Sequence, residues 1–405
     1  MQQSVIIFAC LVGLIVLGGL HPTKADRTIR AGGGPLQGQT TIGEPSHTFP
    51  TSYERLGRSQ VPFVRVVLDD GQSHLFALDP GTANTSIDSA AAKTLNLPIT
   101  AQELAPGVKI DTVTSSALLG SSHLKLNHIQ FIVTDLSNLK AAFPSLTGIL
   151  GANLLSQFIE RINFSKQRID FIIPDNGGNP SLSFAASQPI PLIQGNGKNA
   201  VSVFLDGHPA MFTLSTLYDY TTVHSHSLLA ILKPKSSLSG LPSGEGTPIR
   251  YLRLSSFRLG GIQWSHPVIE EPLAKEMPDT NILGLDFLRR FQLVLDLSSS
   301  KMYLDDEPGY REDPTEWDGL GLFPIKTLEG KMIIAAIGTP SPAKQAGLQV
   351  GDELTQIDGL ATDGMTLEQA AARVKKPVGA TLVLKVRRKS EKRQHGVRLK
   401  VGKLL

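Results

Sequence analysis

One pattern of residues occurs twice in this chain, and this duplication limits the possible folds more than any other feature of the sequence. Each copy begins with an apolar segment, a two-residue turn and a second apolar segment. Matched positions in this block lie 136 residues apart: Gly71 with Gly207, Phe76 with Phe212, and Leu78 with Leu214. A later block repeats at a spacing of 133 residues, matching Ile149-Leu150-Gly151 with Ile282-Leu283-Gly284. Because a solenoid needs about three stacked repeats or more, two copies predict a pair of related lobes.

Both copies carry the signals of β-structure. Val61 to Leu68 is apolar and β-branched, an Asp-Gly hairpin turn comes next, and a second apolar strand follows. Short helices are expected after Asp88 and around residues 153–158. We therefore predict a mainly β protein in which residues 61–175 and 188–306 form two closed, barrel-like lobes, related by a pseudo-twofold axis and facing each other.

Residues 1–25 have the features of a secretory signal peptide. Val5 to Leu20 is an apolar run without a charged residue, and it is shorter than the about 20 residues of a membrane-spanning helix. Ala25 is a small residue that offers a cleavage site before Asp26, so we expect export to the periplasm or the extracellular space. An uncleaved N-terminal segment that anchors the protein in a membrane is the alternative.

Residues 26–60 are rich in Gly, Thr, Pro and Ser without apolar periodicity, which predicts a flexible lead-in. The only cysteine, Cys10, lies in the apolar run. The exported chain is therefore expected to have no disulfide, no thiolate metal ligand and no cysteine nucleophile.

Composition and short motifs exclude several classes of function. The net charge is +3 and 19% of the residues are charged, as in an ordinary globular protein, so we expect no nucleic-acid partner. His224 and His226 lack a third ligand at a recognisable spacing, and Gly195 to Lys198 lacks the Ser or Thr of a phosphate-binding loop. We expect no metal and no cofactor. The basic run from Lys385 to Arg393 alternates with apolar residues and predicts a charged hairpin at a sheet edge.

The segment that ends the first hairpin reads Leu78-Asp79-Pro80-Gly81-Thr82-Ala83. It resembles the catalytic loop of aspartic peptidases of the pepsin and retroviral type, in which apolar residues precede Asp-Thr/Ser-Gly. Gly148 to Leu155 resembles the apolar-apolar-Gly segment that crosses behind that loop in the same family. The resemblance extends from Pro62 to Asp305, and it is closest to bacterial retropepsin-like proteins that have two tandem copies and a trailing PDZ domain.

The resemblance implies a pair of carboxylates, one from each copy, that share a proton and activate a water molecule for attack on a peptide carbonyl. Asp79 would be the catalytic carboxylate of the first copy, Gly81 would let the backbone turn beneath it, and Thr82 would orient it. Pro80 departs from the family, because it has neither the hydroxyl nor the N–H that ties the two loops together.

The second copy lacks the matching carboxylate. Its corresponding stretch has Ser215 at the position of the second Asp and Leu217 at the position of the Gly. Asp219 lies four residues beyond Ser215, past the turn, and is not expected to substitute. Since a serine cannot share a proton as a carboxylate does, the catalytic dyad is expected to be incomplete.

The last part of the chain, residues 318–405, closely resembles a PDZ domain. It contains a Gly-Leu-Gly-Leu stretch from Gly319 to Leu322, a short helix that starts at Ser341, and a helical pattern from Thr366 to Val374. PDZ domains add an extended peptide to a sheet edge and bind its terminal carboxylate through backbone N–H groups. The resemblance places those groups at Leu320, Gly321 and Leu322.

The sequence therefore predicts an exported, aspartic-peptidase-like protein with a PDZ domain that binds polypeptide segments. The expected partners are a polypeptide held by the lobes and peptides with free C-termini held by the PDZ domain. The alternative is an active aspartic endopeptidase that uses Asp79, either within one chain or paired with Asp79 of a second chain in a homodimer.

Overall fold

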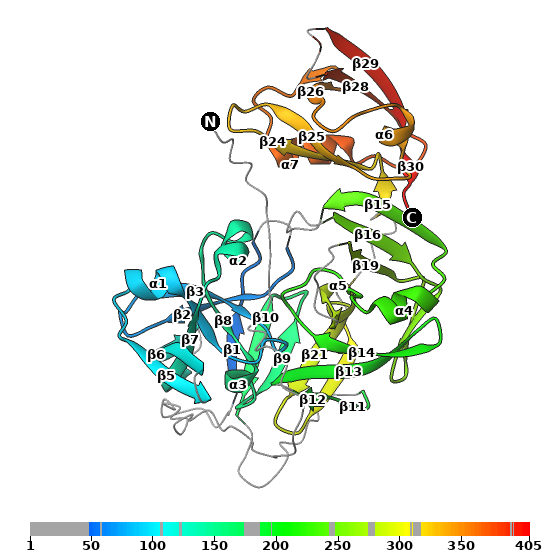
Figure 1. Ribbon diagram of the computed structural model, residues 1–405. Coiled ribbons are helices and arrows are strands. Elements are labelled where there is room, and N and C mark those ends of the chain that lie inside the picture. The colour runs from blue at the N-terminus through cyan, green and yellow to red at the C-terminus, as the bar shows by residue number, and fades with distance from the viewer. Residues whose placement is uncertain are drawn as a thin grey trace.

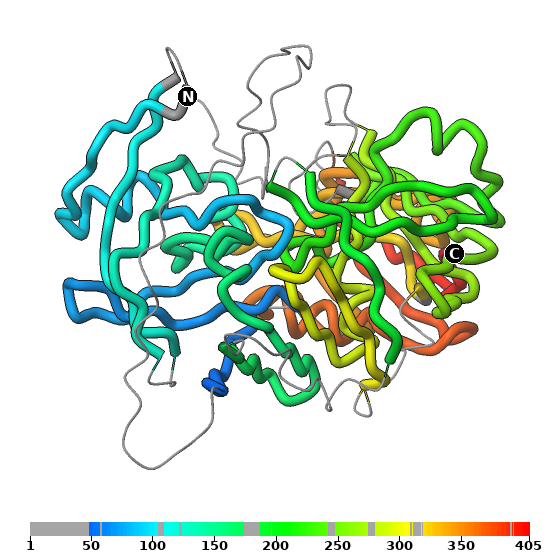
Figure 2. Tube along the Cα trace, turned by 90° about the horizontal axis from the view of Figure 1, so that it is seen from below, coloured from blue at the N-terminus to red at the C-terminus, as the bar shows by residue number. Residues whose placement is uncertain are grey.

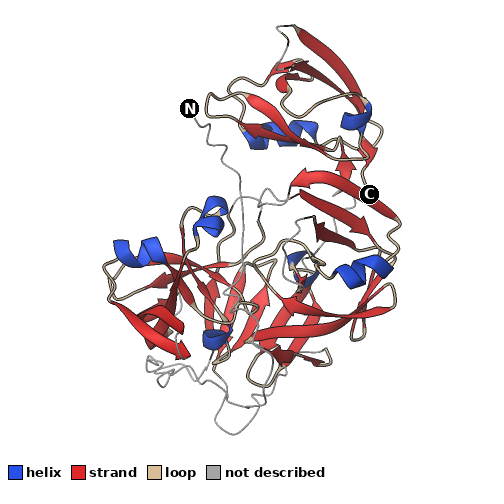
Figure 3. Ribbon diagram, viewed as in Figure 1, coloured by secondary structure: helices blue, strands red, loops and turns tan. Residues whose placement is uncertain are grey.

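The computed structural model describes residues 48–405, apart from residues 57–58, 106–107, 121–123, 174–186, 196, 243–247, 274–279, 308–309, 311–316, 389–390 and 392. The expected signal peptide, the alternative membrane anchor and residues 26–47 of the expected lead-in lie outside the described residues. None of the helices in the described part is long and apolar enough to cross a membrane. Strands dominate the described chain, and its helices are short (Figure 3).

The first half of the chain, residues 48–173, contains a seven-stranded sheet that closes on itself as a barrel. Closure comes from β2 and β6, where Val66 faces Leu119 and Val67 faces Leu118. Across the sheet the strands run in the order β2 (Phe63–Val67), β3 (Ser73–Leu78), β8 (Leu146–Leu150), β4 (Ser86–Asp88), β7 (Lys125–Thr134), β6 (Val108–Leu119) and β5 (Ile99–Ala105). The helices of this half are α1 (Ser89–Thr94), α2 (Ser137–Ala142) and α3 (Ala152–Leu155).

The second half, residues 187–310, has a six-stranded and a three-stranded sheet. Thr222 joins the two sheets, because it forms β-bridges with both Glu270 and Ile282. The larger sheet runs β18 (Ile262–Ser265), β17 (Ser256–Leu259), β13 (Lys198–Leu205), β14 (His208–Leu214) and β20 (Asn281–Leu283), with β12 (Ile193–Gly195) also on β13. The smaller sheet runs β15 (Ser236–Pro242), β16 (Pro248–Arg253) and β19 (Val268–Pro272), and the helices are α4 (His226–Ile231) and α5 (Leu285–Leu288).

The hairpin predicted in each half is present, although only the second has the expected turn. Gly71 has a φ of 73°, and in the second half Asp206 and Gly207 have φ values of 47° and 85°. Two consecutive positive φ angles are what a type I′ hairpin turn requires, and Asp-Gly is among the residue pairs that adopt them most readily. The second half meets this requirement, so its turn fixes the register of β13 with β14. In the first half only Gly71 has a positive φ, and residues 68–72 lie between the paired Val67 and Ser73, so the expected two-residue turn is not formed there.

A third sheet takes strands from both halves. Its order is β1 (Thr48–Ser52), β10 (Arg168–Ile172), β9 (Ile159–Asn163), β21 (Phe291–Asp296), β22 (Lys301–Asp306) and β11 (Ile190–Pro191). The halves meet where β9 pairs with β21, so they lie side by side (Figures 1 and 2). The expectation of two separately closed lobes is therefore wrong in this respect, because each half leaves strands that complete their hydrogen bonds in the shared sheet.

The expected lead-in is also shorter than its range of residues 26–60. Residues Thr48–Ser52 form β1, which pairs with β10, and Tyr53 is buried. The hydrogen bonds that the edge of β10 offers, and not the composition of the segment, order this part of the chain.

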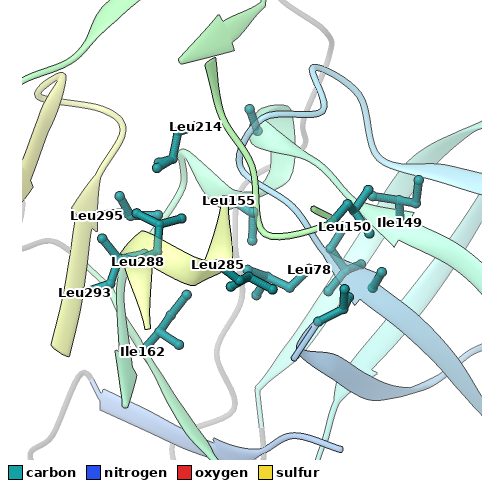
Figure 4. Packing of buried hydrophobic residues seen from close by; sticks show 14 of the residues in the cluster. Leu78, Ile149, Leu150, Leu155, Ile162, Leu214, Leu285, Leu288, Leu293 and Leu295 are labelled. Carbon is teal, nitrogen blue, oxygen red and sulfur yellow. The ribbon is translucent and has the colours of Figure 1, made fainter. Parts of the chain in front are cut away.

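A large hydrophobic core runs through both halves, and a smaller cluster of Ile159, Ile172, Val294 and Tyr303 lies in the shared sheet. The large core includes Leu78 and Leu214, the last residues of the repeated strands β3 and β14. Figure 4 shows that side chains of the two halves pack together, among them Leu150, Leu155 and Ile162 of the first half and Leu285, Leu288, Leu293 and Leu295 of the second. The halves are therefore joined by packing as well as by hydrogen bonds.

The C-terminal domain, residues 317–405, has its own core and its own sheet. The sheet runs β24 (Leu322–Lys326), β25 (Met332–Ile337), β26 (Glu353–Ile357), β28 (Thr381–Arg387) and β29 (Gln394–Lys400); β27 (Leu360–Ala361) pairs with β26, and β23 (Asp318–Gly319) pairs with β30 (Gly402–Lys403). Helix α6 (Pro342–Gln345) starts at the cap Ser341, and α7 (Leu367–Val374) starts at a capping box of Thr366 and Gln369. The predicted helices of this domain are thus confirmed.

Glu160 of β9 is a buried carboxylate at the centre of the shared sheet. It lies opposite Phe171 and Leu295, it has no exposed surface, and neither oxygen has a hydrogen-bond partner in the described structure. Burial raises the pKa of Glu160 well above its ordinary value, and the charge of Asp296 adds to the rise. The folded state therefore favours the protonated form.

We predict that Glu160→Gln stabilises the protein increasingly as the pH rises. When folding raises the pKa of an acid, the free energy of unfolding falls as the pH rises above the pKa of the unfolded state, about 4.3 for Glu. The fall is at most about 1.4 kcal/mol per pH unit. Denaturant unfolding at pH 4 and pH 8 measures this effect. Glu368→Gln, at an exposed position of α7, is the control. A Glu160→Gln variant whose advantage does not grow between the two pH values would contradict the prediction.

Candidate functional site

Two loops, one from each half, meet where the repeated hairpins end. The first loop, residues 79–85, follows β3, and the second loop, residues 215–221, follows β14. A Cβ atom on Gly81 would lie 2.0 Å from the carbonyl oxygen of Leu214 and 3.2 Å from the Cβ of Ser215. Only glycine fits at this contact, so the structure brings together the two positions that the sequence matched, Asp79 and Ser215.

Asp79 is buried, with 2% of its surface exposed, and its carboxylate is held by both loops. Its Oδ1 accepts hydrogen bonds from the N–H of Gly81 at 3.2 Å and from the N–H of Thr216 at 2.9 Å. Its Oδ2 accepts from the Thr82 hydroxyl at 2.6 Å, as expected for an orienting residue. Burial raises the pKa of Asp79, while the hydrogen bonds from Thr82, Thr216, Gly81 and Ser215 oppose that rise.

Thr216 and Asn199 tie the loops together, and sequence reasoning did not single them out. The Thr216 hydroxyl donates to the carbonyl oxygen of Leu78 in a short hydrogen bond. The Asn199 side chain donates to the carbonyl oxygen of Pro80 at 2.9 Å. Pro80 therefore takes part in the connection as an acceptor, although it has no donor to offer. Thr216 is the residue that matches Pro80 in the repeat, which is the signal that could have identified it.

Behind the loops, the two halves make equivalent hydrogen bonds. In the first half, Thr85 N–H donates to Asn153 Oδ1 at 2.7 Å, and Gly151 N–H donates to Thr85 Oγ1 at 3.0 Å. The matched residues of the second half repeat these contacts: Thr221 N–H donates to Asp286 Oδ1 at 2.8 Å, and Gly284 N–H donates to Thr221 Oγ1 at 3.3 Å. The duplication in the sequence is thus a duplication of contacts.

The two halves differ in the side chain that accepts these hydrogen bonds, an amide in the first half and a titratable carboxyl group in the second. Asp286 occupies the place of Asn153, and burial raises the pKa of Asp286 to about 7. Burial also raises the pKa of Glu270 to about 8, with the charge of Asp286 adding to the rise. Both groups therefore favour their protonated forms in the folded protein up to neutral pH.

Asp219, which was not expected to substitute for a second carboxylate, binds a different segment of the chain. Its Oδ1 accepts the N–H of Gln60 at 2.9 Å and the hydroxyl of Ser59 at 3.4 Å, so it ties down the segment before β2. Leu217 is buried, and its N–H donates to the Ser215 hydroxyl at 3.2 Å. In the described part of the chain, no three His, Cys, Asp or Glu residues are arranged to hold a metal ion.

In the C-terminal domain, two of the predicted carboxylate-binding residues, Leu320 and Gly321, form a tight turn, and the third, Leu322, begins β24. Leu320 is buried, and Gly321 has a φ of 70°. A Cβ on Gly321 would lie 2.3 Å from the Cβ of Ser341, so this position also requires glycine. The carbonyl oxygens of Leu320 and Gly321 accept hydrogen bonds from Ala343 N–H at 2.9 Å and Gly338 N–H at 2.7 Å.

The turn has N–H groups without a backbone acceptor among the described residues, and the elements beside it carry exposed apolar side chains. No backbone hydrogen bond of the described structure uses the N–H of Leu320 or Gly321. Strand β24 is at one end of its sheet, and α7 packs against it. Phe323 on β24 and Leu367 on α7 are exposed apolar side chains. An extended segment could therefore add to β24 beside α7 with its end at the turn.

The C-terminal domain matches known proteins. A model of the PDZ domain family matches residues 333–388. The carboxy-terminal processing protease CtpB of Bacillus subtilis (strain 168) is 26% identical over 110 residues, which are 27% of this chain and 22% of that protein. The chain thus spans 22% of the length of this curated relative.

Two solved structures are also similar to this chain, each over 22% of it. One is the PDZ domain of a carboxy-terminal protease from Vibrio cholerae in complex with peptide, with 22% identity over 22% of this chain and 95% of that chain, and a TM-score of 0.20. The other is the photosystem II D1 C-terminal processing protease, with 18% identity over 22% of this chain and 24% of that chain, and a TM-score of 0.21. The family match shows that the chain carries a PDZ domain at its C-terminus.

We predict that Gly81→Ala destabilises the protein, because the added methyl group would collide with the backbone of Leu214, the residue of β14 that leads into the second loop. Overpacking of this kind costs about 1–3 kcal/mol of unfolding free energy. The matched control is Gly261→Ala, where a Cβ would meet no atom within 4 Å. Urea unfolding of the two variants and the wild type measures the difference, and equal stabilities would refute the close contact of the loops.

Proposed function

We propose that this protein is an exported, peptide-binding relative of the aspartic peptidases whose catalytic dyad is incomplete, with a PDZ domain that binds peptide C-termini. The observation that carries the proposal is the meeting of Asp79 with Ser215, where the family has two carboxylates. The equivalent contacts of Thr85 and Thr221 support a pseudo-twofold relation between the halves. The apolar run from Val5 to Leu20 is the basis for proposing export.

Peptide hydrolysis by this family needs one ionised and one protonated carboxyl group around a shared water. Asp79 keeps the hydrogen bonds that orient such a group, from Thr82, Gly81 and Thr216. Ser215 supplies a hydroxyl, which neither ionises nor protonates in the acid range. Asp79 alone therefore lacks the second carboxyl group with which it would share the proton of the dyad.

Pairing with Asp79 of another chain would require the halves to separate. The second loop already occupies the surface that a second first loop would use, since Gly81 lies against Leu214. Separation would also expose the core that the halves share, at about 25 cal/mol per Å² of apolar surface. Because the halves are tethered, their effective concentration for each other is of the order of millimolar, which further favours pairing within one chain.

The PDZ domain supplies the binding activity. A peptide would add to β24 as an antiparallel strand, and its carboxylate would accept hydrogen bonds from the N–H groups of Leu320, Gly321 and Leu322. The first two of these groups have no other backbone acceptor in the described structure. Phe323 and Leu367 would give the peptide apolar contacts.

We predict that the protein does not digest an unfolded protein substrate between pH 3 and pH 7. Wild type and Asp79→Asn should be assayed together with the double variant Ser215→Asp/Leu217→Gly, which restores both features that the second loop lacks. Substrate cleavage by the wild type that is lost in Asp79→Asn would overturn the proposal. A rate that rises with the square of the enzyme concentration would point to a dimeric dyad. Cleavage by the double variant, with none by the wild type, would directly support the proposal that the dyad of the wild type is incomplete.

We also predict that the full chain binds a peptide with an apolar, free C-terminus at least about tenfold more tightly than the same peptide with a C-terminal amide, because hydrogen bonds to a charged acceptor contribute about 1.5–3 kcal/mol. Gly321→Ala should abolish the difference. Gly359→Ala is the matched control, since Gly359 also has a positive φ, 81°, but its Cβ would meet no atom within 4 Å. Equal affinity of the wild type for the two peptides would remove carboxylate binding from the proposal.

A further inference from the structure

The PDZ domain is attached to the second half by a backbone bridge. Ser239 of β15 donates its N–H to the Thr339 carbonyl oxygen at 2.9 Å, and Thr339 donates its N–H to the Ser239 carbonyl oxygen at 2.7 Å. Strand β15 has a bulge at this point, because its register with β16 shifts between Ser239 and Leu241. Gly240 is the extra residue, with a φ of 88°. The bulge frees Ser239 to pair outside its own sheet.

Next to the bridge, one side chain of the second half lies against the support of the carboxylate-binding turn. Leu238 is fully buried, and a Cβ on Gly338 would lie 2.8 Å from its Cδ1 atom. Gly338 in turn donates its N–H to the carbonyl oxygen of Gly321 at 2.7 Å. Leu238 is therefore only one residue removed from the turn that would bind a peptide carboxylate.

The segment that enters the turn is also held by the second half. The ring of Trp317, three residues before Leu320, has its centroid 4.8 Å from that of Tyr251 on β16 and 6.0 Å from that of Tyr220 in the second loop. The Trp317 carbonyl oxygen accepts the N–H of Leu404 at 2.8 Å. Both sides of the turn thus rest on the β15–β16 hairpin and its neighbours.

We propose that Leu238 and Trp317 are positioning residues for the peptide-carboxylate site, so that the second half of the chain completes a site whose donors belong to the PDZ domain. This inference rests on the function proposed above. Hydrogen-bond donors recognise a carboxylate only when they are held within about 0.5 Å of the required geometry. Leu238 fixes Gly338, Gly338 fixes Gly321, and the packing of Trp317 fixes the chain on the other side of the turn.

The test measures a ratio in the full chain: the affinity for an apolar C-terminal peptide with a free carboxylate divided by the affinity for its amidated twin. Leu238→Ala should lower this ratio about fivefold or more, the lower range of couplings between sites. Gly338→Ala should partly restore it in the Leu238→Ala background, because the new methyl group fills the space that Leu238 leaves. Trp317→Ala is a second variant that acts from the other side of the turn.

The control is Leu252→Ala, which removes a buried side chain of the same hairpin from the core of the two halves. It should leave the ratio unchanged. A wild type that does not distinguish the two peptides would defeat the proposed function itself. A wild type that does distinguish them, with Leu238→Ala and Trp317→Ala keeping its ratio, would overturn the positioning role alone. A fall in the Leu252→Ala ratio equal to that of Leu238→Ala would also overturn it, since it would show a general loss of stability.

Discussion

The contact between the backbones of the two loops is the constraint on which the rest of the structure depends. At Gly81 the first loop lies so close to the Leu214 carbonyl group that the Cβ atom of any other residue would collide with it. That contact sets where the repeated hairpins end, and it brings Thr216 within hydrogen-bonding distance of Asp79. With the halves in this mutual position, they also share a hydrophobic core and the sheet in which β9 pairs with β21.

The site combines strict geometry with altered chemistry. Asp79 has donors on both of its oxygens, and its Thr82 partner is in place. The neighbouring Ser215 is buried but carries no charge. Our proposal of an incomplete dyad rests on this combination of a firmly held carboxylate with an uncharged neighbour. The C-terminal PDZ domain gives such a protein a separate means of holding a polypeptide.

The parts of the fold that the sequence predicted well are those with local signals. The hairpin turns have Asp-Gly pairs, the helix α7 has a capping box, and the Gly151 and Gly284 segments repeat each other. The shared sheet had no such signal, because the pairing of β9 with β21 joins strands that are far apart in the chain. Each strand alone has the same apolar pattern whether it pairs within its half or across.

For the site, a spacing of 136 residues matched Asp79 with Ser215, and the resemblance to the aspartic peptidases pointed to Thr82. It did not predict Asn199 or the role of Thr216, because a polar residue beside a strand has the same appearance whether it faces water or a neighbouring loop. Burial separates the two cases, and burial depends on the whole fold. The support of the carboxylate-binding turn by Leu238 was hidden for the same reason.

The shared sheet has a consequence for how the chain is made. On a ribosome, β9 emerges long before β21, its partner, which begins at Phe291. Until then the first half has an unpaired strand edge, and such edges readily pair with other chains. Pairing over so long a separation in sequence also slows folding. The nascent first half is therefore the stage at which this protein is most exposed to aggregation, and a chaperone that shields the edge of β9 would act at that stage.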